Sequence, residues 1–201
     1  MAEENQDEVT EEQEESTPKK RGRPAKTQEQ KDQEEFQGYL QHVFDNEGGL
    51  ADVKEDRGGL TKYGVTIKTL GDYLGRDATR DEVVDMTLET AATIYEGMYW
   101  KPSRAGQLKK ELRMTYFDMC INHGQRNAVR ILQKAINRKS RGGIPIVDVD
   151  GLIGKNTIKY AKKVDADSLR AERMLFFANL VTKRPKQMRF WLGWYRRCVS
   201  T

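Results

Sequence analysis

The sequence predicts an α+β fold that is mainly α-helical, with one small β-hairpin region beside the first helix and a disordered tail before it. Three observations support this prediction. Apolar residues recur with helical spacing through most of the chain after residue 35. A glycine-rich stretch, residues 44–66, interrupts this pattern near its beginning. The first 35 residues are almost free of apolar side chains.

The tail, residues 1–35, holds four apolar residues against twelve acids and six bases. So little apolar surface cannot offset the entropy of ordering the chain, and the tail is therefore expected to be disordered. The remaining residues carry 29 bases and 19 acids, although the net charge of the whole chain is only +4. A body this basic is expected to be drawn to anionic polymers, such as nucleic acid, teichoic acid, lipopolysaccharide or peptidoglycan.

The first helix is predicted over residues 36–46, where one apolar stripe recurs at helical spacing. Gly48 and Gly49 end it, because glycine is favoured just past a helix terminus. Residues 50–66 predict turns and short strands.

Capping signals and apolar spacing place the later helices. Thr79 and Glu82 form a capping box that opens a brief helix, and Thr87 caps the next, which runs to about residue 99. A turn-rich link is predicted over 142–154. The remaining predicted helices cover residues 112–123, 127–137, 155–163, 167–183 and 186–197.

Two acids of the glycine-rich stretch are candidate catalytic groups. Glu47 follows the first helix at its C-terminal end, where the helix dipole disfavours an ionised carboxylate and raises its pKa, as suits a proton donor. Asp56 follows nine residues later, across a hairpin that can fold it back toward Glu47. Two carboxylates in different environments can cleave a glycosidic bond. The alternative interpretation is an acidic surface loop without chemistry.

The order of fixed residues resembles glycoside hydrolase family 108, which contains phage-type N-acetylmuramidases, or endolysins. The matching pattern begins with Glu47-Gly-Gly, continues through Asp52 and Asp56, and ends with Thr61 and Thr66. Further similarity lies at Tyr99-Trp100-Lys-Pro, at Ile121-Asn122-His-Gly and over residues 149–157, and the whole covers about residues 36–197. His123 departs from the pattern, since the family often has Ser there.

The resemblance implies a lysozyme-like fold, with a catalytic lobe over residues 36–125 and a helical peptidoglycan-associated lobe over residues 126–201. It implies that Glu47 protonates the leaving oxygen between N-acetylmuramic acid and N-acetylglucosamine. Asp56 would stabilise the transition state and, with Thr61, hold the attacking water. We therefore expect inversion, with carboxyl groups roughly 6.5–9.5 Å apart. Asp52 remains the rival for the second acid, or a hairpin residue that bonds backbone amides.

Substrate contacts are expected from aromatic faces that stack on sugar rings and from polar groups that bond to acetamido groups. The aromatic pair at 99–100 could equally belong to the core, and the amide at 122 could equally cap a helix. The candidate substrate-binding residues are Asp52, Tyr63, Thr66, Tyr99, Trp100 and Asn122.

A basic motif in the tail, Arg21-Gly22-Arg23-Pro24, resembles an AT-hook, which lies in the narrow minor groove of A·T-rich DNA. The alternative is a basic patch in an acidic tail, which could tether the protein to virion components. Near the other end, residues 189–197 interleave aromatics with arginines. They are expected to pack on the core, or else to form an amphipathic surface for anionic lipid.

No metal or cofactor site is predicted, because His42 and His123 stand apart and no phosphate-binding loop occurs. Cys120 is expected to be a buried thiol and Cys198 is far from it in sequence, so no disulfide is predicted. The chain lacks a secretion signal and any apolar run of the ~18–20 residues needed for a transmembrane helix.

The sequence therefore predicts a monomeric muramidase, made in the host cytoplasm, that reaches the wall through a holin lesion or is carried in the virion. One alternative is a lytic transglycosylase, which uses a single Glu and releases anhydro products. Another is a DNA-associated virion protein with an inactive lysozyme fold. The host and the preferred wall chemistry stay open.

Overall fold

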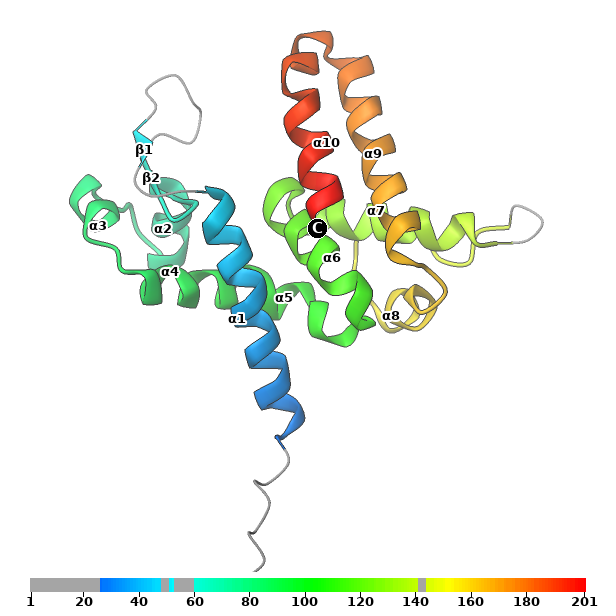
Figure 1. Ribbon diagram of the computed structural model, residues 1–201, viewed down its shortest axis with the longest axis horizontal. Coiled ribbons are helices and arrows are strands. Elements are labelled where there is room, and N and C mark those ends of the chain that lie inside the picture. Colours follow the sequence, from blue (N-terminus) through cyan, green and yellow to red (C-terminus); the bar gives the residue numbers. More distant parts are fainter. Residues whose placement is uncertain (1–25, 48–50, 53–59, 141–143) are drawn as a thin grey trace, which may run out of the picture.

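The computed structural model describes residues 26–47, 51–52, 60–140 and 144–201. The molecule is mainly helical, with one small antiparallel sheet (Figure 1). The first helix, the sheet and three short helices form one side, and the longer helices of the second half of the chain form the other. One hydrophobic cluster extends from Phe36 in the first helix to Leu169 in the second half. The predicted fold class is confirmed.

The first helix, α1 (Gln28–Glu47), begins eight residues before the predicted start, so the last part of the expected disordered tail is helical. Thr27 and Gln30 form a reciprocal cap at its start. The Thr27 N–H donates to Gln30 Oε1 at 3.0 Å, and the Gln30 N–H donates to Thr27 Oγ1 at 3.2 Å. Arg113 then pairs with Glu35, and lies 3.6 Å from Asp32. These polar contacts order a segment that apolar spacing alone cannot detect.

The sheet follows α1 and has the order β1-β2-β3, built from β1 (Ala51–Asp52), β2 (Leu60–Lys62) and β3 (Val65–Thr66). A two-residue turn of Tyr63 and Gly64 joins the last two strands, with φ of 52° and 74°. Positive φ at both positions is the requirement of a type I′ hairpin. Tyr63 adopts this conformation at a cost, so its ring contacts must compensate.

Helix α2 (Ile67–Leu74) was not predicted, because its short apolar pattern is interrupted by Gly71. That glycine is required by close packing: an added Cβ would lie 2.9 Å from the carbonyl oxygen of Arg76. Thr66 caps α2 by accepting from the N–H of Thr69 at 3.0 Å.

The next elements confirm the predicted caps. The capping box of Thr79 and Glu82 opens α3 (Arg80–Val84), and Thr87 caps α4 (Leu88–Tyr95). A π-helical turn continues α4 and two further short turns lead into the second half: η1 (Glu96–Trp100), α5 (Lys101–Ser103) and η2 (Ala105–Gln107).

The second half is almost entirely helical, and the predicted positions of its helices are confirmed within a few residues. The last predicted helix begins as a 3₁₀ segment after Pro185 and becomes α-helical at Trp191. The elements are α6 (Lys110–His123), α7 (Gln125–Arg138), α8 (Lys155–Ala161), α9 (Ala166–Lys183), η4 (Pro185–Phe190) and α10 (Trp191–Ser200).

Helix α6 runs through the core, and its residues from Thr115 to Cys120 are buried consecutively. Cys120 is a buried free thiol, as expected, and Cys198 is a second one. Burial raises the pKa of Cys120 to about 12, so this thiol stays protonated and unreactive.

Candidate functional site

The backbone of two candidate acids, Glu47 and Asp52, lies at the end of α1 and in the first strand of the sheet. Glu47 is the last residue of α1, and Asp52 in β1 pairs with Leu60 in β2. Thr61, half-buried, is opposite Ala51 on one side and Thr66 on the other. Asp56 lies outside the described residues, as do the side chains of Glu47 and Asp52. The backbone thus carries these candidates on adjoining elements.

An aromatic contact fixes the end of α1 against the sheet. The ring of Phe44, three residues before Glu47, has its centroid 5.9 Å from that of Tyr63 and 5.9 Å from that of Tyr95. The Tyr95 hydroxyl donates to the carbonyl oxygen of Tyr63 at 3.3 Å. Because Tyr63 follows β2 directly, these contacts hold Thr61 and the last turn of α1 in a fixed relation.

A pocket of about 400 Å³ lies between α1 and α10, just before the end of α1. His42 and Val43 line it from α1, about one turn before Glu47, and Asp118 lines it from α6. Helix α10 contributes Gly193 and the cation Arg196. Gly193 and Arg196 were not among the predicted site residues, because their place depends on how α10 packs.

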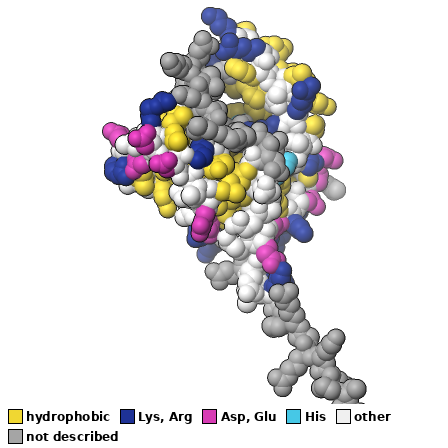
Figure 2. All heavy atoms as spheres, turned by 60° about the vertical axis from the view of Figure 1, so that its left-hand side comes forward, with side chains coloured by type: hydrophobic (Ala, Val, Ile, Leu, Met, Phe, Trp, Pro, Cys, Tyr) yellow, Lys and Arg dark blue, Asp and Glu magenta, His cyan; other side chains and the backbone are white. Residues whose placement is uncertain are grey.

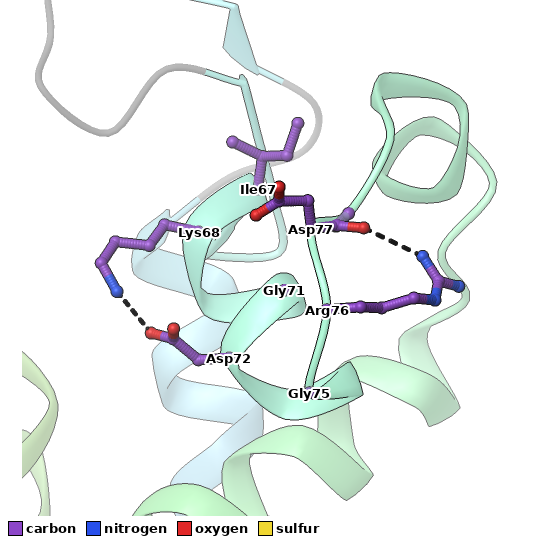
Figure 3. A pocket seen from close by; sticks show the side chains of 8 residues that line it. Ile67, Lys68, Gly71, Asp72, Gly75, Arg76 and Asp77 are labelled. Carbon is purple, nitrogen blue, oxygen red and sulfur yellow. Dashed lines mark hydrogen bonds and ion pairs between the residues drawn. The ribbon is translucent and has the colours of Figure 1, made fainter.

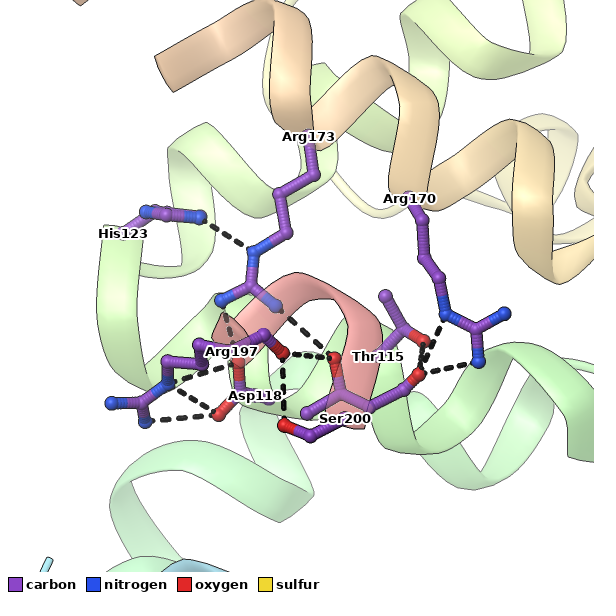
Figure 4. A network of polar contacts seen from close by, with 8 residues as sticks. Thr115, Asp118, His123, Arg170, Arg173, Arg197 and Ser200 are labelled. Carbon is purple, nitrogen blue, oxygen red and sulfur yellow. Dashed lines mark hydrogen bonds and ion pairs between the residues drawn. The ribbon is translucent and has the colours of Figure 1, made fainter. Parts of the chain in front are cut away.

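A buried charge network supports the wall of this pocket (Figure 4). Asp118, only 4% exposed, accepts from Arg173 at 2.5 Å and pairs with Arg197 at 2.9 Å. The Arg173 side chain is fully buried, and its Nε also donates to His123 Nε2 at 3.1 Å. One carboxylate therefore compensates two guanidinium groups that join α6, α9 and α10.

His123 is held neutral within this network. Burial, aided by the positive charge of Arg173, lowers the pKa of His123 to about 3. Its ring lies 4.9 Å from both Phe176 and Phe177, measured between centroids. The neutral imidazole is the form that can accept the hydrogen bond from Arg173.

We expect acid to weaken the fold through His123. Its folded pKa of about 3 lies below the unfolded value of 6.5, so the unfolded state binds the proton between these values and stability falls as pH drops through this window. From pH 7 to pH 5 the loss should reach up to about 2 kcal/mol. Urea unfolding at both pH values measures it. In His123→Gln, which keeps an acceptor but does not titrate, the pH dependence should be weaker; an equal loss in both proteins would contradict this account.

The two aromatic residues predicted to contact the substrate differ in burial: Trp100 is buried, and Tyr99 is half-buried. Trp100 is 8% exposed, and its ring packs against Phe36, Tyr39 and Phe117 at centroid distances of 5.4, 5.7 and 5.1 Å. Trp100 thus occupies the core, the alternative that the sequence left open. Tyr99 is half-buried, 5.6 Å from Tyr95 between centroids.

The polar candidates have different surroundings. The Thr66 hydroxyl caps α2 by accepting from the N–H of Thr69, so it is already engaged in a hydrogen bond within the fold. Asn122 is exposed in the last turn of α6. Its amide is therefore accessible to a ligand, in contrast to that hydroxyl.

A second pocket, of about 830 Å³, is lined by α2 and by the segment that follows it, residues 75–78 (Figure 3). The charged groups that line it already form ion pairs and hydrogen bonds with protein groups. Lys68 pairs with Asp72 at 2.6 Å. Arg76 donates to the carbonyl oxygen of Asp77 at 3.0 Å and pairs with Glu82 at 2.5 Å. Thr61, the catalytic candidate whose side chain the structure describes, does not line this pocket.

The aromatic residues of 189–197 also divide. Trp194 stacks on Phe177 with centroids 4.6 Å apart, which is the expected core packing. Phe190, Leu192 and Tyr195 remain between 46 and 57% exposed. Basic side chains gather beside them, over the turn between α9 and α10 at the upper end of the molecule (Figure 2).

Other sequence predictions concern the tail, metals and membranes. Arg21, Gly22, Arg23 and Pro24 lie outside the described residues. Within the described ranges no three His, Cys, Asp or Glu side chains are grouped so that they could hold a metal ion. The helices of this described part are also too short or too polar to span a bilayer.

Comparison with known proteins assigns both halves of the chain. The family model described as "Glycosyl hydrolase 108" matches residues 40–124, and the one described as "Predicted Peptidoglycan domain" matches residues 127–199. No curated protein matches the chain. Eleven chains of solved structures match, among them Brucella abortus SagA, with 30% identity and a TM-score of 0.71. That similarity covers 84% of this chain and 91% of the SagA chain.

Proposed function

The chain belongs to the glycosyl hydrolase 108 family, and we propose that it is a muramidase that hydrolyses the β-1,4 bond between N-acetylmuramic acid and N-acetylglucosamine. The family makes it a lysozyme-like glycoside hydrolase, and the second matched region makes peptidoglycan its partner. The observation that carries the proposal is the junction of α1 and the sheet, where the backbone of Glu47, Asp52 and Thr61 lies on adjoining elements.

Glu47 is the proposed general acid, which protonates the leaving oxygen while the sugar gains oxocarbenium character. Asp56 is the proposed second acid, with Thr61 helping to hold the attacking water, and Asp52 is its rival. If water attacks directly, the product inverts. The aromatic clamp of Phe44 and Tyr63 supports this assignment, because the reacting groups must be held in a fixed geometry.

The identity of the products tests the proposed bond and reaction. Digestion of purified murein, followed by mass spectrometry, should yield muropeptides that end in reducing N-acetylmuramic acid. A lytic transglycosylase would release 1,6-anhydro products, lighter by one water. If anhydro products predominated, the hydrolysis proposal would be wrong and the enzyme would be a lytic transglycosylase.

Gly193 provides a test of the pocket between α1 and α10. No described heavy atom lies within 4 Å of a Cβ added to Gly193, so Gly193→Ala should fit and stabilise α10 by roughly 0.5–1 kcal/mol. The added methyl narrows the pocket, and wall lysis should slow by up to roughly tenfold. Thermal unfolding and turbidity loss of cell walls measure the two effects.

The control for this prediction is Gly38→Ala, in α1. Gly38 is also exposed, its added Cβ meets nothing within 4 Å, and it does not line the pocket. This variant should gain similar stability with unchanged lysis. If lysis were also unchanged in Gly193→Ala, the pocket between α1 and α10 would not take part in binding the substrate.

We further propose that the protein works as a monomeric phage endolysin or virion-associated lysozyme, which reaches the wall by holin-type release or within the particle. The basic motif at 21–24 supports an added contact with A·T-rich DNA or virion components. A gel shift on A·T-rich duplex, with and without residues 1–25, tests the DNA contact. Equal shifts in both proteins would assign any binding to the basic body instead.

A further inference from the structure

A groove separate from the catalytic candidates lies between α7 and α9, with a volume of about 440 Å³. Each helix lines it with four residues at the spacing i, i+3, i+4 and i+7, which is one helical face. Ile131 from α7 and Phe176 and Leu180 from α9 supply its apolar surface. The groove therefore has the concave apolar form of a ligand site.

Three cations border this groove: Arg130 and Lys134 from α7 and Lys183 from α9. None of the described residues that line the groove is acidic. Lys134 and Lys183 are exposed and have no ion pair with a described residue, although Lys134 also lines a neighbouring pocket that contains Glu172. The rim therefore presents positive charge to solvent.

The sequence of α7 shows that this charge is not placed for helix stability. Four bases follow one another at intervals of four residues, Arg126, Arg130, Lys134 and Arg138, and α7 contains no acid. Like charges at i and i+4 destabilise a helix. Of these four bases, only Arg138 has an ion pair with a described residue, to Glu172, and both of these residues line the neighbouring pocket. An anionic ligand would remove the repulsion among the others.

Two amides complete the groove and are oriented by the helices. The Nδ2 groups of Asn127 and Asn179 donate to the carbonyl oxygens of His123 and Leu175, at 2.9 and 2.8 Å. Their Oδ1 atoms accept from no described residue, so they can accept from a peptide N–H. The groove thus combines cations, hydrogen-bond acceptors and small apolar surfaces.

We propose that this groove binds the peptide stems of peptidoglycan, with the stem carboxylates at Lys134 and Lys183. A stem offers what the lining complements: free carboxylates, amide N–H groups and the methyl groups of alanine. The proposal rests on the proposed function to the extent that peptidoglycan is the partner. It adds a second point of attachment, which raises the local concentration of the glycan at the catalytic site.

The test measures binding to peptidoglycan sacculi by co-sedimentation, with the full chain in a Glu47→Gln background so that the sacculi survive. Lys134→Ala/Lys183→Ala should weaken binding to intact sacculi by about twofold to thirtyfold, the effect of two exposed ion pairs. It should leave unchanged the binding to stem-free glycan strands that an amidase has released from sacculi and that are then immobilised on beads. A soluble stem tetrapeptide should compete with intact sacculi only for the protein that keeps both lysines.

The matched control is Lys110→Ala/Lys162→Ala, which removes two exposed lysines that do not line the groove. It should bind intact sacculi as well as the parent protein. Equal losses in both double variants would reduce the effect to net charge and overturn the proposal. It would also be overturned if the groove variant lost affinity for A·T-rich duplex instead of intact sacculi, since the groove would then serve nucleic acid.

Failure of the proposed function appears in a different measurement. It would be seen as wild-type protein that sediments with sacculi but releases no muropeptides. The comparison of intact sacculi with immobilised stem-free glycan strands can still be made in that case, and the same two outcomes decide the stem proposal. In the active protein, the groove variant should keep wild-type turnover on short glycans without stems.

Discussion

Replacing Glu47 by Gln is expected to reduce wall lysis by about 10²–10⁴-fold, the contribution of a positioned general acid. Gln keeps the size of the side chain but has no acidic proton to give to the leaving oxygen. Glu47 ends α1, and the clamp of Phe44 and Tyr63 that holds this helix end does not involve its carboxyl group. The thermal midpoint should therefore stay within about 1 °C of wild type. Turbidity loss of purified walls and calorimetry make the two measurements.

The control for this prediction is Asp45→Asn, which removes a carboxylate in the same turn of α1. It should leave lysis within about twofold of wild type if position, rather than charge, decides the effect. The prediction would be wrong if Glu47→Gln retained most of its lysis. A large loss of stability would also contradict it, because Glu47 would then act in folding.

The same assay separates the two candidates for the second acid. If Asp56 holds water with Thr61, Asp56→Asn should lose activity nearly as strongly as Glu47→Gln, whereas Asp52→Asn should lose much less. Asp52 pairs with Leu60 in the sheet, so its replacement should also lower stability if its carboxylate bonds to backbone amides. The reverse order of activities would assign the chemistry to Asp52.

Local signals in the sequence were sufficient for much of the fold. Thr79 and Thr87 cap helices because their hydroxyls bond to an N–H three residues later, which spacing reveals. The start of α1 carries the same signal in Thr27 and Gln30, but the low apolar content of residues 1–35 led to a prediction of disorder. Arg113, 78 residues away, pairs with Glu35 and helps to order this helix, which no local pattern shows. Helix α2 was missed because a glycine needed for tertiary packing interrupts its apolar pattern.

The candidate site shows the same division. Glu47, Asp52 and Thr61 belong to one short ordered motif, so the resemblance identified them without any structure. Gly193 reaches the pocket only because α10 packs against α9 and thereby lies opposite α1. From the sequence, Trp100 could either stack on a sugar ring or pack in the core. Its contacts with Phe36 and Phe117, which are distant in sequence, place it in the core. Sequence identifies residue types, and packing decides which of them are accessible.

The largest expected effect on stability comes from Asp118. In Asp118→Asn, two guanidinium groups lose the carboxylate that compensates them, and Arg173 has no access to water because its side chain is fully buried. Breaking a buried pair in this way should cost about 3–5 kcal/mol. The midpoint and slope of urea unfolding measure the loss. Asp167→Asn is the matched control, because Asp167 pairs with Arg170 but is 94% exposed, and its loss should cost less than about 1 kcal/mol.

A double variant shows whether the cost arises from an uncompensated charge rather than from the lost hydrogen bonds. Asp118→Leu/Arg173→Met removes the buried cation together with its partner, and apolar replacements of buried pairs are often nearly neutral. Arg197 is 25% exposed, so its guanidinium can turn toward water. The double variant should therefore be more stable than Asp118→Asn, even though it removes more hydrogen bonds. If it were less stable, hydrogen bonding to His123 and Thr201 would be the larger contribution of Arg173, and the network would stabilise the fold by geometry rather than by charge.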